Sequence, residues 1–320
     1  MKKIGFYLPH LDLLGTGVSC FDYAYHNEKI LGNKSFFICD KNDHRTHPAS
    51  AEKFKKYLNV IELDGKEDMS ALRREAINLN LDAIYTTKPG RISEGRFIED
   101  MPSFIHCCGV VNEPHGTVYA YVSKWLSDTC TQGIAPVVPL MVDLPHSTEN
   151  LREKLNIPQD AIVFGRLGSD GSWNLPFVND VINFTVQNNK NVYFLLGNTP
   201  KFTTHERVIF HEPFADLLYK RIFINTCDAM LHARHEGESY GVAVAEFSSC
   251  NKPVLTFSGS PERNHIATLK EKGLYYNDPN TLYNILNSFT PQPEKDWNAY
   301  KDVTPENVMQ KFKSVFIDKL

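Results

Sequence analysis

Two glutamates, Glu238 and Glu246, are separated by seven residues in a short run of small and apolar side chains. That run predicts the start of a buried helix, with one carboxylate just before its N-terminus and the other about two turns into it. At ~1.5 Å rise per residue, the two are roughly 12 Å apart along the helix axis. Free N–H groups of a first helical turn bind anions, so this spacing suits an extended anionic ligand held at both ends.

Glu246 is the more informative of the two glutamates. Its neighbours are all apolar, namely Val242, Ala243, Val244, Ala245 and Phe247. Glutamate is almost never fully buried unless it is paired. Each glutamate also has a non-functional explanation. Glu238 would be an acidic residue that the helix dipole favours at a helix start, and Glu246 would be a residue on the helix surface. The apolar surroundings favour a functional pair over these alternatives.

The elements around the pair form a strand–loop–helix–strand unit. An apolar strand is expected over 228–232, a loop with both signs of charge over 234–239, a helix over 240–250 and a second strand over 253–257. The loop therefore follows the carboxyl end of a strand. Open α/β sheets bind their ligands at that end.

Length and composition indicate a globular protein of two domains. The chain has 320 residues, of which 42% are hydrophobic and 22% charged, with a net charge of −4. This acidic balance excludes a general affinity for nucleic acid, and no stretch approaches the ~20 apolar residues of a membrane span. Peripheral membrane contact stays open. Seven cysteines without a C-x-x-C pair indicate free thiols in a reducing compartment, so we expect a cytoplasmic protein.

Strand-like and helix-like segments alternate along the whole chain, which predicts an α/β fold with mostly parallel sheets. Strands are expected at 3–8, 35–39, 59–63, 81–85, 103–107, 118–123, 161–165, 191–196, 207–210, 228–232, 253–257 and 274–276. Helices are expected at 17–31, 50–57, 69–79, 124–130, 175–188, 214–221, 240–250, 263–272 and 280–288.

A proline-rich seam at 135–150 divides the chain into an expected N-terminal domain, 1–140, and C-terminal domain, 141–302. A final segment, 303–320, reads as a helix capped by Thr304, with its packing partner left open. Two Rossmann-like domains of this kind place a ligand cleft between them.

The spacing of Glu238 and Glu246 resembles the E-x7-E motif of retaining glycosyltransferases with the GT-B fold, the glycogen-synthase-like family four. Residues 232–241, the run Lys252-Pro253-Val254 and the run Phe164-Gly165-Arg166 are also similar to a subgroup of this family. In the first half, Gly15-Thr16-Gly17 after the first strand is family-like. The resemblance covers about 160–260 well and the first half in outline.

The resemblance implies two facing Rossmann-like domains, with a UDP- or GDP-linked sugar bound mainly by the second domain and the acceptor mainly by the first. Glu246 would bind the ribose hydroxyls, because a carboxylate only accepts hydrogen bonds. Glu238 would act at the donor sugar near its reacting carbon. The backbone of Ser239, Tyr240, Gly241 and Val242 would contact sugar and phosphates, and Gly15, Thr16 and Gly17 are further expected donor contacts.

Two further residues follow from the same resemblance. Arg166 would hold the diphosphate with a planar guanidinium, or be an ordinary arginine at a strand end. His106 would lie near the reaction centre, or be a core histidine with satisfied ring nitrogens. Transfer would retain the anomeric configuration, as a hexosyl- or pentosyltransferase with neither a metal nor a cofactor, to a glycan, lipid or protein acceptor.

The sequence departs from the family after Arg166, where many members carry a lysine that contacts the diphosphate. The segment 167–172 contains no lysine. Amides of this glycine-rich loop, or another cation such as Arg234, would have to replace it.

Parts of the sequence are also compatible with three other functions. A nicotinamide dehydrogenase would use Gly15, Gly17 and Asp40, but residues 9–14 separate the glycines from the strand, and Cys20 occupies the third glycine position. A metal site could use His106, Cys107, Cys108 and His115, although adjacent cysteines in a strand point to opposite faces. A non-catalytic carbohydrate or nucleotide binder is the third.

Overall fold

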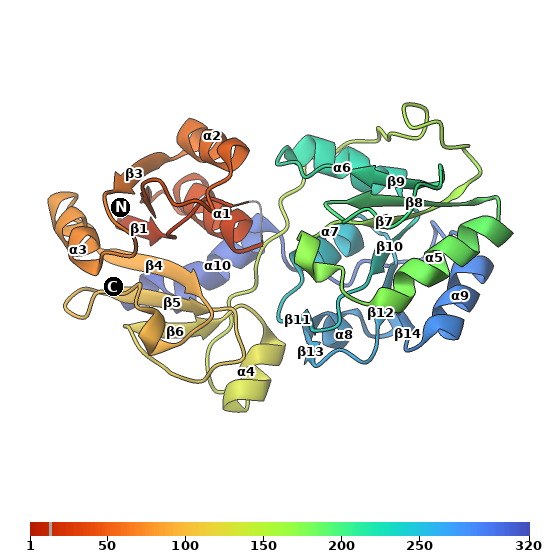
Figure 1. Ribbon diagram of the computed structural model, residues 1–320. Coiled ribbons are helices and arrows are strands. Elements are labelled where there is room, and N and C mark those ends of the chain that lie inside the picture. The colour runs from red at the N-terminus through yellow and green to blue at the C-terminus, as the bar shows by residue number, and fades with distance from the viewer. Residues whose placement is uncertain (13–14) are drawn as a thin grey trace. The chain divides into compact units, whose positions relative to one another are not determined.

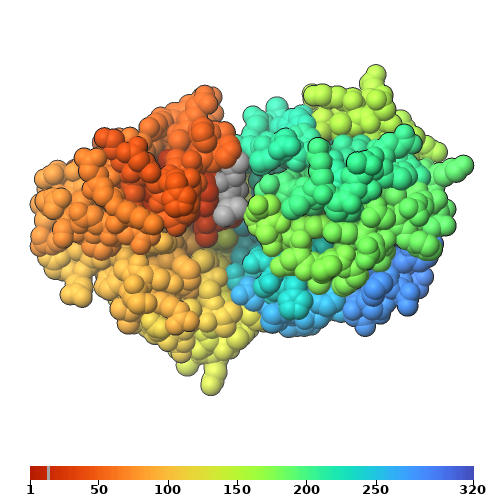
Figure 2. Space-filling model, in the orientation of Figure 1, coloured from red at the N-terminus to blue at the C-terminus, as the bar shows by residue number. Residues whose placement is uncertain are grey.

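The computed structural model describes residues 1–12 and 15–320, which form two compact units. The first unit comprises Met1–Asp143 and Asp302–Leu320, and the second comprises Leu144–Lys301. In Figure 2 the visible surface of the first unit is red to yellow and that of the second is green to blue, as expected from chain order. These boundaries lie within a few residues of the seams expected at 140 and 302.

The first unit is built on a parallel sheet of six strands in the order β3-β2-β1-β4-β5-β6 (Figure 1). Its strands are β1 (Lys3–Tyr7), β2 (Lys34–Asp40), β3 (Asn59–Leu63), β4 (Ala83–Lys88), β5 (Ser103–Cys107) and β6 (Val118–Tyr121). Its helices are α1 (Gly15–Lys29), α2 (Pro48–Tyr57), α3 (Met69–Asn78), α4 (Lys124–Thr131) and α10 (Pro305–Val315), with 3-10 turns η1 (Ile92–Glu94) and η4 (Ile317–Lys319). This is the strand order of a dinucleotide-binding Rossmann fold.

The second unit repeats that order in its own six-stranded parallel sheet, β14-β12-β10-β7-β8-β9. Its strands are β7 (Ile162–Arg166), β8 (Val192–Gly197), β9 (Val208–His211), β10 (Ala229–His232), β12 (Val254–Phe257) and β14 (Gly273–Tyr276). Its helices are α5 (Pro176–Asn188), α6 (Leu217–Thr226), α7 (Val242–Ser249), α8 (Asn264–Leu269) and α9 (Pro279–Ser288), with 3-10 turns η2 (Asp170–Ser172) and η3 (Lys270–Lys272). A separate two-residue pair joins β11 (Gly237–Glu238) to β13 (Glu262–Arg263).

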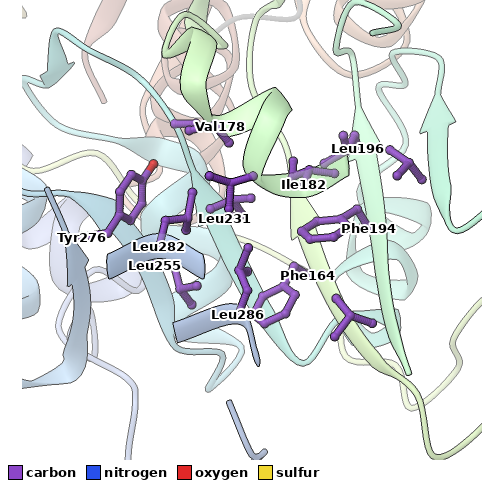
Figure 3. Packing of buried hydrophobic residues seen from close by; sticks show 14 of the residues in the cluster. Phe164, Val178, Ile182, Phe194, Leu196, Leu231, Leu255, Tyr276, Leu282 and Leu286 are labelled. Carbon is purple, nitrogen blue, oxygen red and sulfur yellow. The ribbon is translucent and has the colours of Figure 1, made fainter. Parts of the chain in front are cut away.

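The core of the second unit lies between this sheet and helices α5 and α9 (Figure 3). The strands contribute buried Phe164, Phe194, Leu231 and Leu255, and the helices contribute Val178, Ile182, Leu282 and Leu286. Fully burying one such side chain contributes about 1.5–3 kcal/mol. Both helices begin with a proline at the first turn, where the missing N–H costs no helical hydrogen bond. The expected two-domain α/β fold is confirmed.

The C-terminal helix α10 completes the core of the first unit. Thr304 caps it by accepting a hydrogen bond from the Asn307 amide, as its sequence predicted. The ring of Phe312 lies 5.1 Å from that of Tyr23 and 5.4 Å from that of Tyr85. Figure 1 shows α10, in blue, beside the orange and yellow strands of this unit. The partner that the sequence left open is therefore the first sheet with helix α1.

Helix α1 begins at Gly15, two residues earlier than expected. The run Gly15-Thr16-Gly17, interpreted from sequence as a loop, is the first turn of this helix. Gly17 is required there for packing, because a side chain would collide with the carboxylate and carbonyl of Asp12. Within 1–12 and 15–320, no helix combines the length and apolar character needed to cross a membrane.

Candidate functional site

The candidate site lies at the point where the connections of the second sheet reverse direction, between β7 and β10. These strands pair in parallel, and their carboxyl ends fall at Arg166 and His232. Gly165 allows close packing there, since a side chain would collide with Cys227 and press on Phe247 of α7. A switch point of this kind is where open α/β sheets bind ligands.

The short pair β11–β13 positions Glu238 beside these strand ends. Gly237 pairs with Glu262, and Glu238 pairs with Arg263. Gly237 has φ +77°, and a side chain at this position would collide with the carbonyl of Glu262. Only glycine satisfies both the backbone conformation and the close approach. This pair was not predicted from the sequence, because two-residue strands 25 positions apart leave no periodic pattern.

Two basic side chains hold the carboxylate of Glu238, which is 19% exposed. His232 Nε2 lies 3.1 Å from Oε1, and Arg234 Nη1 lies 3.1 Å from Oε2. Burial alone would raise the pKa of Glu238, but the hydrogen bond from His232 and the charges of His232 and Arg234 outweigh it, so the pKa is lowered. Glu238 is therefore an ionised carboxylate at neutral pH.

His232 is fixed from its other side by Thr256. Its Nδ1 lies 2.8 Å from Thr256 Oγ1, and the two residues are direct partners in the β10–β12 register. An ionised carboxylate only accepts, so Nε2 carries the proton toward Glu238. Three side chains, from β10, β12 and β11, thus form a single hydrogen-bonded chain.

A second histidine, His265 of α8, packs against this chain. Its ring centre lies 4.9 Å from that of His232, and the side chain is fully buried. Neither ring nitrogen has a hydrogen-bond partner among residues 1–12 and 15–320. Burial, with a smaller effect of the neighbouring His232, lowers the pKa of His265 to about 3. His265 is therefore neutral and adds no second positive charge next to Glu238.

Helix α7 begins at Val242, with Gly241 as its N-cap residue. Gly241 has φ +90° and no side chain with which to cap the helix, and a side chain would press on Cβ and Cγ of Glu238. Asn264 donates to the carbonyl of Tyr240 over 2.8 Å and holds this turn in place. The first-turn N–H groups that follow make no i→i−4 bonds within the helix.

Glu246 lies in the interior of α7 and is 5% exposed. Its Oε1 is 2.7 Å from Nζ of Lys220 on α6. The expectation that a glutamate among apolar neighbours has a partner is confirmed, but sequence reasoning did not identify Lys220. Nothing in the local pattern links two residues that are 26 positions apart on different helices.

Arg166 joins the loops that follow β7 and β8. Its guanidinium is nearly fully buried, and burial lowers its pKa to about 10. It donates to the carbonyls of Gly197 (2.8 Å), Asn198 and Ser169 and to the hydroxyls of Thr199 (3.0 Å) and Ser172 (2.8 Å). This arginine organises loop 168–172, which argues for an indirect role, and a direct contact with a diphosphate stays a prediction.

His106 occupies the core of the first unit, which agrees with the alternative of a core histidine, and a catalytic role for it stays a prediction. It is fully buried, its Nδ1 lies 2.6 Å from the Tyr85 hydroxyl, and its Nε2 lies 2.8 Å from the Val138 carbonyl. Burial lowers its pKa to about 4. Both ring nitrogens are therefore hydrogen-bonded within the core. Gly15, Thr16 and Gly17 lie in α1, and their contact with a donor stays a prediction.

The geometry also bears on the other functions. Asp40, the proposed ribose acid of a dehydrogenase, is buried and accepts from the Tyr7 hydroxyl (3.0 Å) and the Glu67 amide (2.7 Å). Both oxygens of the Asp40 carboxylate thus accept hydrogen bonds from the protein itself, which argues against a role in binding a ribose. For the metal site, the Cys107 thiol donates to the Pro89 carbonyl, and no group of three or more potential ligands occurs in the described residues.

The fold is the GT-B fold of glycosyltransferases, with two Rossmann-like units. The sequence matches no protein-family model and no curated protein. Among solved structures, it is similar to Anabaena HepE (Alr3699) in complex with UDP and glucose, at TM-score 0.72 and 15% identity over 99% of this chain and 96% of that chain.

A glycosyltransferase from Rickettsia africae gives TM-score 0.72 and 13% identity over 99% of this chain and 98% of that one. The Staphylococcus aureus protein MnaA, solved with UDP, gives TM-score 0.66 and 12% identity over 100% and 98%. At these identities the likeness establishes the fold.

Proposed function

We propose that this protein is a glycosyltransferase that moves a sugar from a nucleoside-diphosphate sugar to an acceptor hydroxyl. The observation that carries the proposal is the placement of Glu238 and Glu246 on either side of the α7 start, each paired with a basic side chain. HepE was solved with UDP-glucose as well as with UDP, so a UDP-linked sugar is the first donor to test. GDP-linked sugars are the second.

Glu246 is assigned to the ribose of the donor. Lys220 pairs with Oε1, which leaves Oε2 as the acceptor for ribose hydroxyls. Lys220 also supplies the positive charge that a buried carboxylate needs. The low exposure of Glu246 favours binding over proton transfer.

The diphosphate is assigned to the backbone N–H groups of residues 239–242 and the first turn of α7. Negative charge is stabilised there by the helix dipole. Arg166 contributes by fixing loop 168–172. Arg234, whose side chain is 33% exposed, is the cation that replaces the lysine absent after Arg166. In this proposal neither a metal ion nor a cofactor is required.

Glu238 is assigned to the donor sugar near its reacting carbon. An ionised carboxylate there orients sugar hydroxyls and stabilises positive charge that develops as the leaving group departs. We further propose retention of configuration, with a hexose or pentose as the transferred group and a glycan, lipid or protein as the acceptor. All seven cysteines are free thiols, which supports a cytoplasmic location.

A ligand-binding measurement tests the nucleotide class. The unfolding temperature is measured with UDP, UDP-glucose, GDP and NAD in turn, because a ligand that binds only the native state stabilises it. We expect UDP and UDP-glucose, or else GDP, to raise it, and NAD to leave it unchanged. A shift with NAD alone would contradict the proposal and support a dehydrogenase.

Turnover measurements test the roles of the two glutamates. Nucleotide release from UDP-glucose and other donors is followed with a panel of acceptors. Glu246→Ala should raise the donor Kd roughly 10-fold or more while changing kcat less, and Glu238→Ala should lower kcat roughly 100-fold with a smaller change in Kd. If the wild type binds donor but no acceptor stimulates release, the protein is instead a non-catalytic binder.

A further inference from the structure

The chain Thr256–His232–Glu238 has a geometry that the proposed function does not require by itself. Each link is a direct contact of 2.8 Å or 3.1 Å, and Thr256 and His232 are almost completely buried. A surface glutamate that only bound a sugar hydroxyl would need no such support. The second nitrogen of His232 contacts the Thr256 hydroxyl, so the ring is held from both sides.

We propose that His232, oriented by Thr256, is a positioning residue that fixes the Glu238 carboxylate as a hydrogen-bond acceptor for the donor sugar. This inference rests on the proposed function and deepens it by assigning a residue that acts through Glu238. His232 Nε2–H occupies Oε1, and Arg234 occupies one position on Oε2. The remaining lone pairs of the carboxylate are thereby given a defined direction.

Burial and charge agree with this assignment. The largest influence on Glu238 is burial, which favours the neutral acid, and the contact with His232 is the first of the opposing effects that keep it ionised. Without the imidazole, Arg234 is the nearest remaining counter-charge, with a side chain that is 33% exposed. Other titratable or charged groups that influence, or are influenced by, Glu238 are Arg166, Glu262, His265 and Tyr300.

The direct test is the titration of Glu238 itself. The protein is labelled with carboxyl-¹³C glutamate, and the Glu238 signal is identified as the one missing in Glu238→Gln. In His232→Ala the pKa of Glu238 should move upward, and in Thr256→Val it should move in the same direction by less. Thr256→Ser keeps the hydroxyl and should titrate like the wild type.

A buried threonine elsewhere serves as the matched control. Thr86 is fully buried, and its hydroxyl donates to the Tyr7 carbonyl in the first unit. Thr86→Val removes a comparable hydrogen bond and should leave the Glu238 titration unchanged. The proposal is overturned if the pKa of Glu238 is the same as in the wild type in all three variants, Thr256→Val, Thr86→Val and His232→Ala.

Kinetics add a second readout that a merely structural role would not move. With UDP-glucose as the probe donor, Thr256→Val should lower kcat roughly 10-fold with little change in KM, and the acid limb of the kcat–pH profile should shift upward. Thr256→Ser should restore both. Absence of turnover in the wild type would count against the proposed transferase, whereas the carboxyl titration would still decide the role of His232.

Discussion

At the scale of single residues, the buried pair of Lys220 and Glu246 carries the first prediction. Their side chains are 14% and 7% exposed, so removing one partner leaves an uncompensated charge in an apolar setting. Lys220→Met should lower the free energy of unfolding by about 3 kcal/mol or more and weaken UDP binding. Urea unfolding and UDP titration measure the two effects.

An exposed ion pair provides the control for that change. Lys313 and Asp318 are 2.6 Å apart, and both are 48% exposed. Lys313→Met should cost less than about 1 kcal/mol and leave UDP binding unchanged. The double variant Lys220→Met/Glu246→Gln should recover part of the lost stability, since it removes the isolated charge, but not the affinity for UDP. Equal costs for the buried and exposed lysines would refute this account.

At the scale of elements, the pair β11–β13 is the device that places Glu238. Gly237→Ala should destabilise the protein by about 2 kcal/mol or more and sharply reduce UDP-glucose turnover, because the new methyl group meets the Glu262 carbonyl. Unfolding curves and nucleotide release measure the outcome. Gly32 has a similar φ of +64° with no atom within 4 Å of the added carbon, so Gly32→Ala isolates the backbone strain. If Gly237→Ala lowers the free energy of unfolding no more than Gly32→Ala does, the close approach to the Glu262 carbonyl is unimportant.

The elements themselves were largely predictable. The strands now seen as β2, β5 and β7 were expected within about one residue, because apolar runs between polar turns are local signals. Helix α6 begins three residues after its expected start, where Asp216 caps it by accepting from the Tyr219 amide. The β11–β13 pair was missed, since its pairing depends on contacts between distant segments.

The candidate site was predictable only in part. The pattern around Glu238 and Glu246 predicted a helix over 240–250, which the structure contains as α7. The need of Glu246 for a partner followed from its apolar neighbours. The partners themselves, Lys220 and His232, depend on which elements the sheet order brings together. His106 was correctly placed on a strand, but its contact with the ring of Phe316, the C-cap residue of α10, joins positions 210 residues apart (316 − 106).

At the scale of the whole molecule, each unit contains a buried histidine that is neutral in the native state. Because neither histidine takes up a proton readily while buried, both lower the free energy of unfolding at acid pH. The pKa is lowered to about 4 for His106 and about 3 for His265, mainly by burial. The unfolded chain therefore binds protons below about pH 6.5 that the native state does not, and stability is lost as pH falls from there through pH 4.

Urea unfolding at pH 7.5 and pH 5.0 tests this loss, which should be on the order of 2 kcal/mol for each histidine. His265→Phe should reduce the difference between the two pH values in the transition of the second unit. An unchanged difference would mean that His265 is protonated as readily in the native state as in the unfolded chain. His146, which is exposed, provides the control through His146→Gln.

The return of α10 to the first sheet has a consequence for biosynthesis. Residues 144–301 are contiguous, so the second unit has all of its sheet and covering helices once that stretch has left the ribosome. Most of the first unit is synthesised earlier, yet Tyr23 and Tyr85 lack the ring of Phe312 until α10 has been synthesised, after the whole of the second unit. The core of the first unit is therefore completed after that of the second unit, although most of the first unit is synthesised earlier.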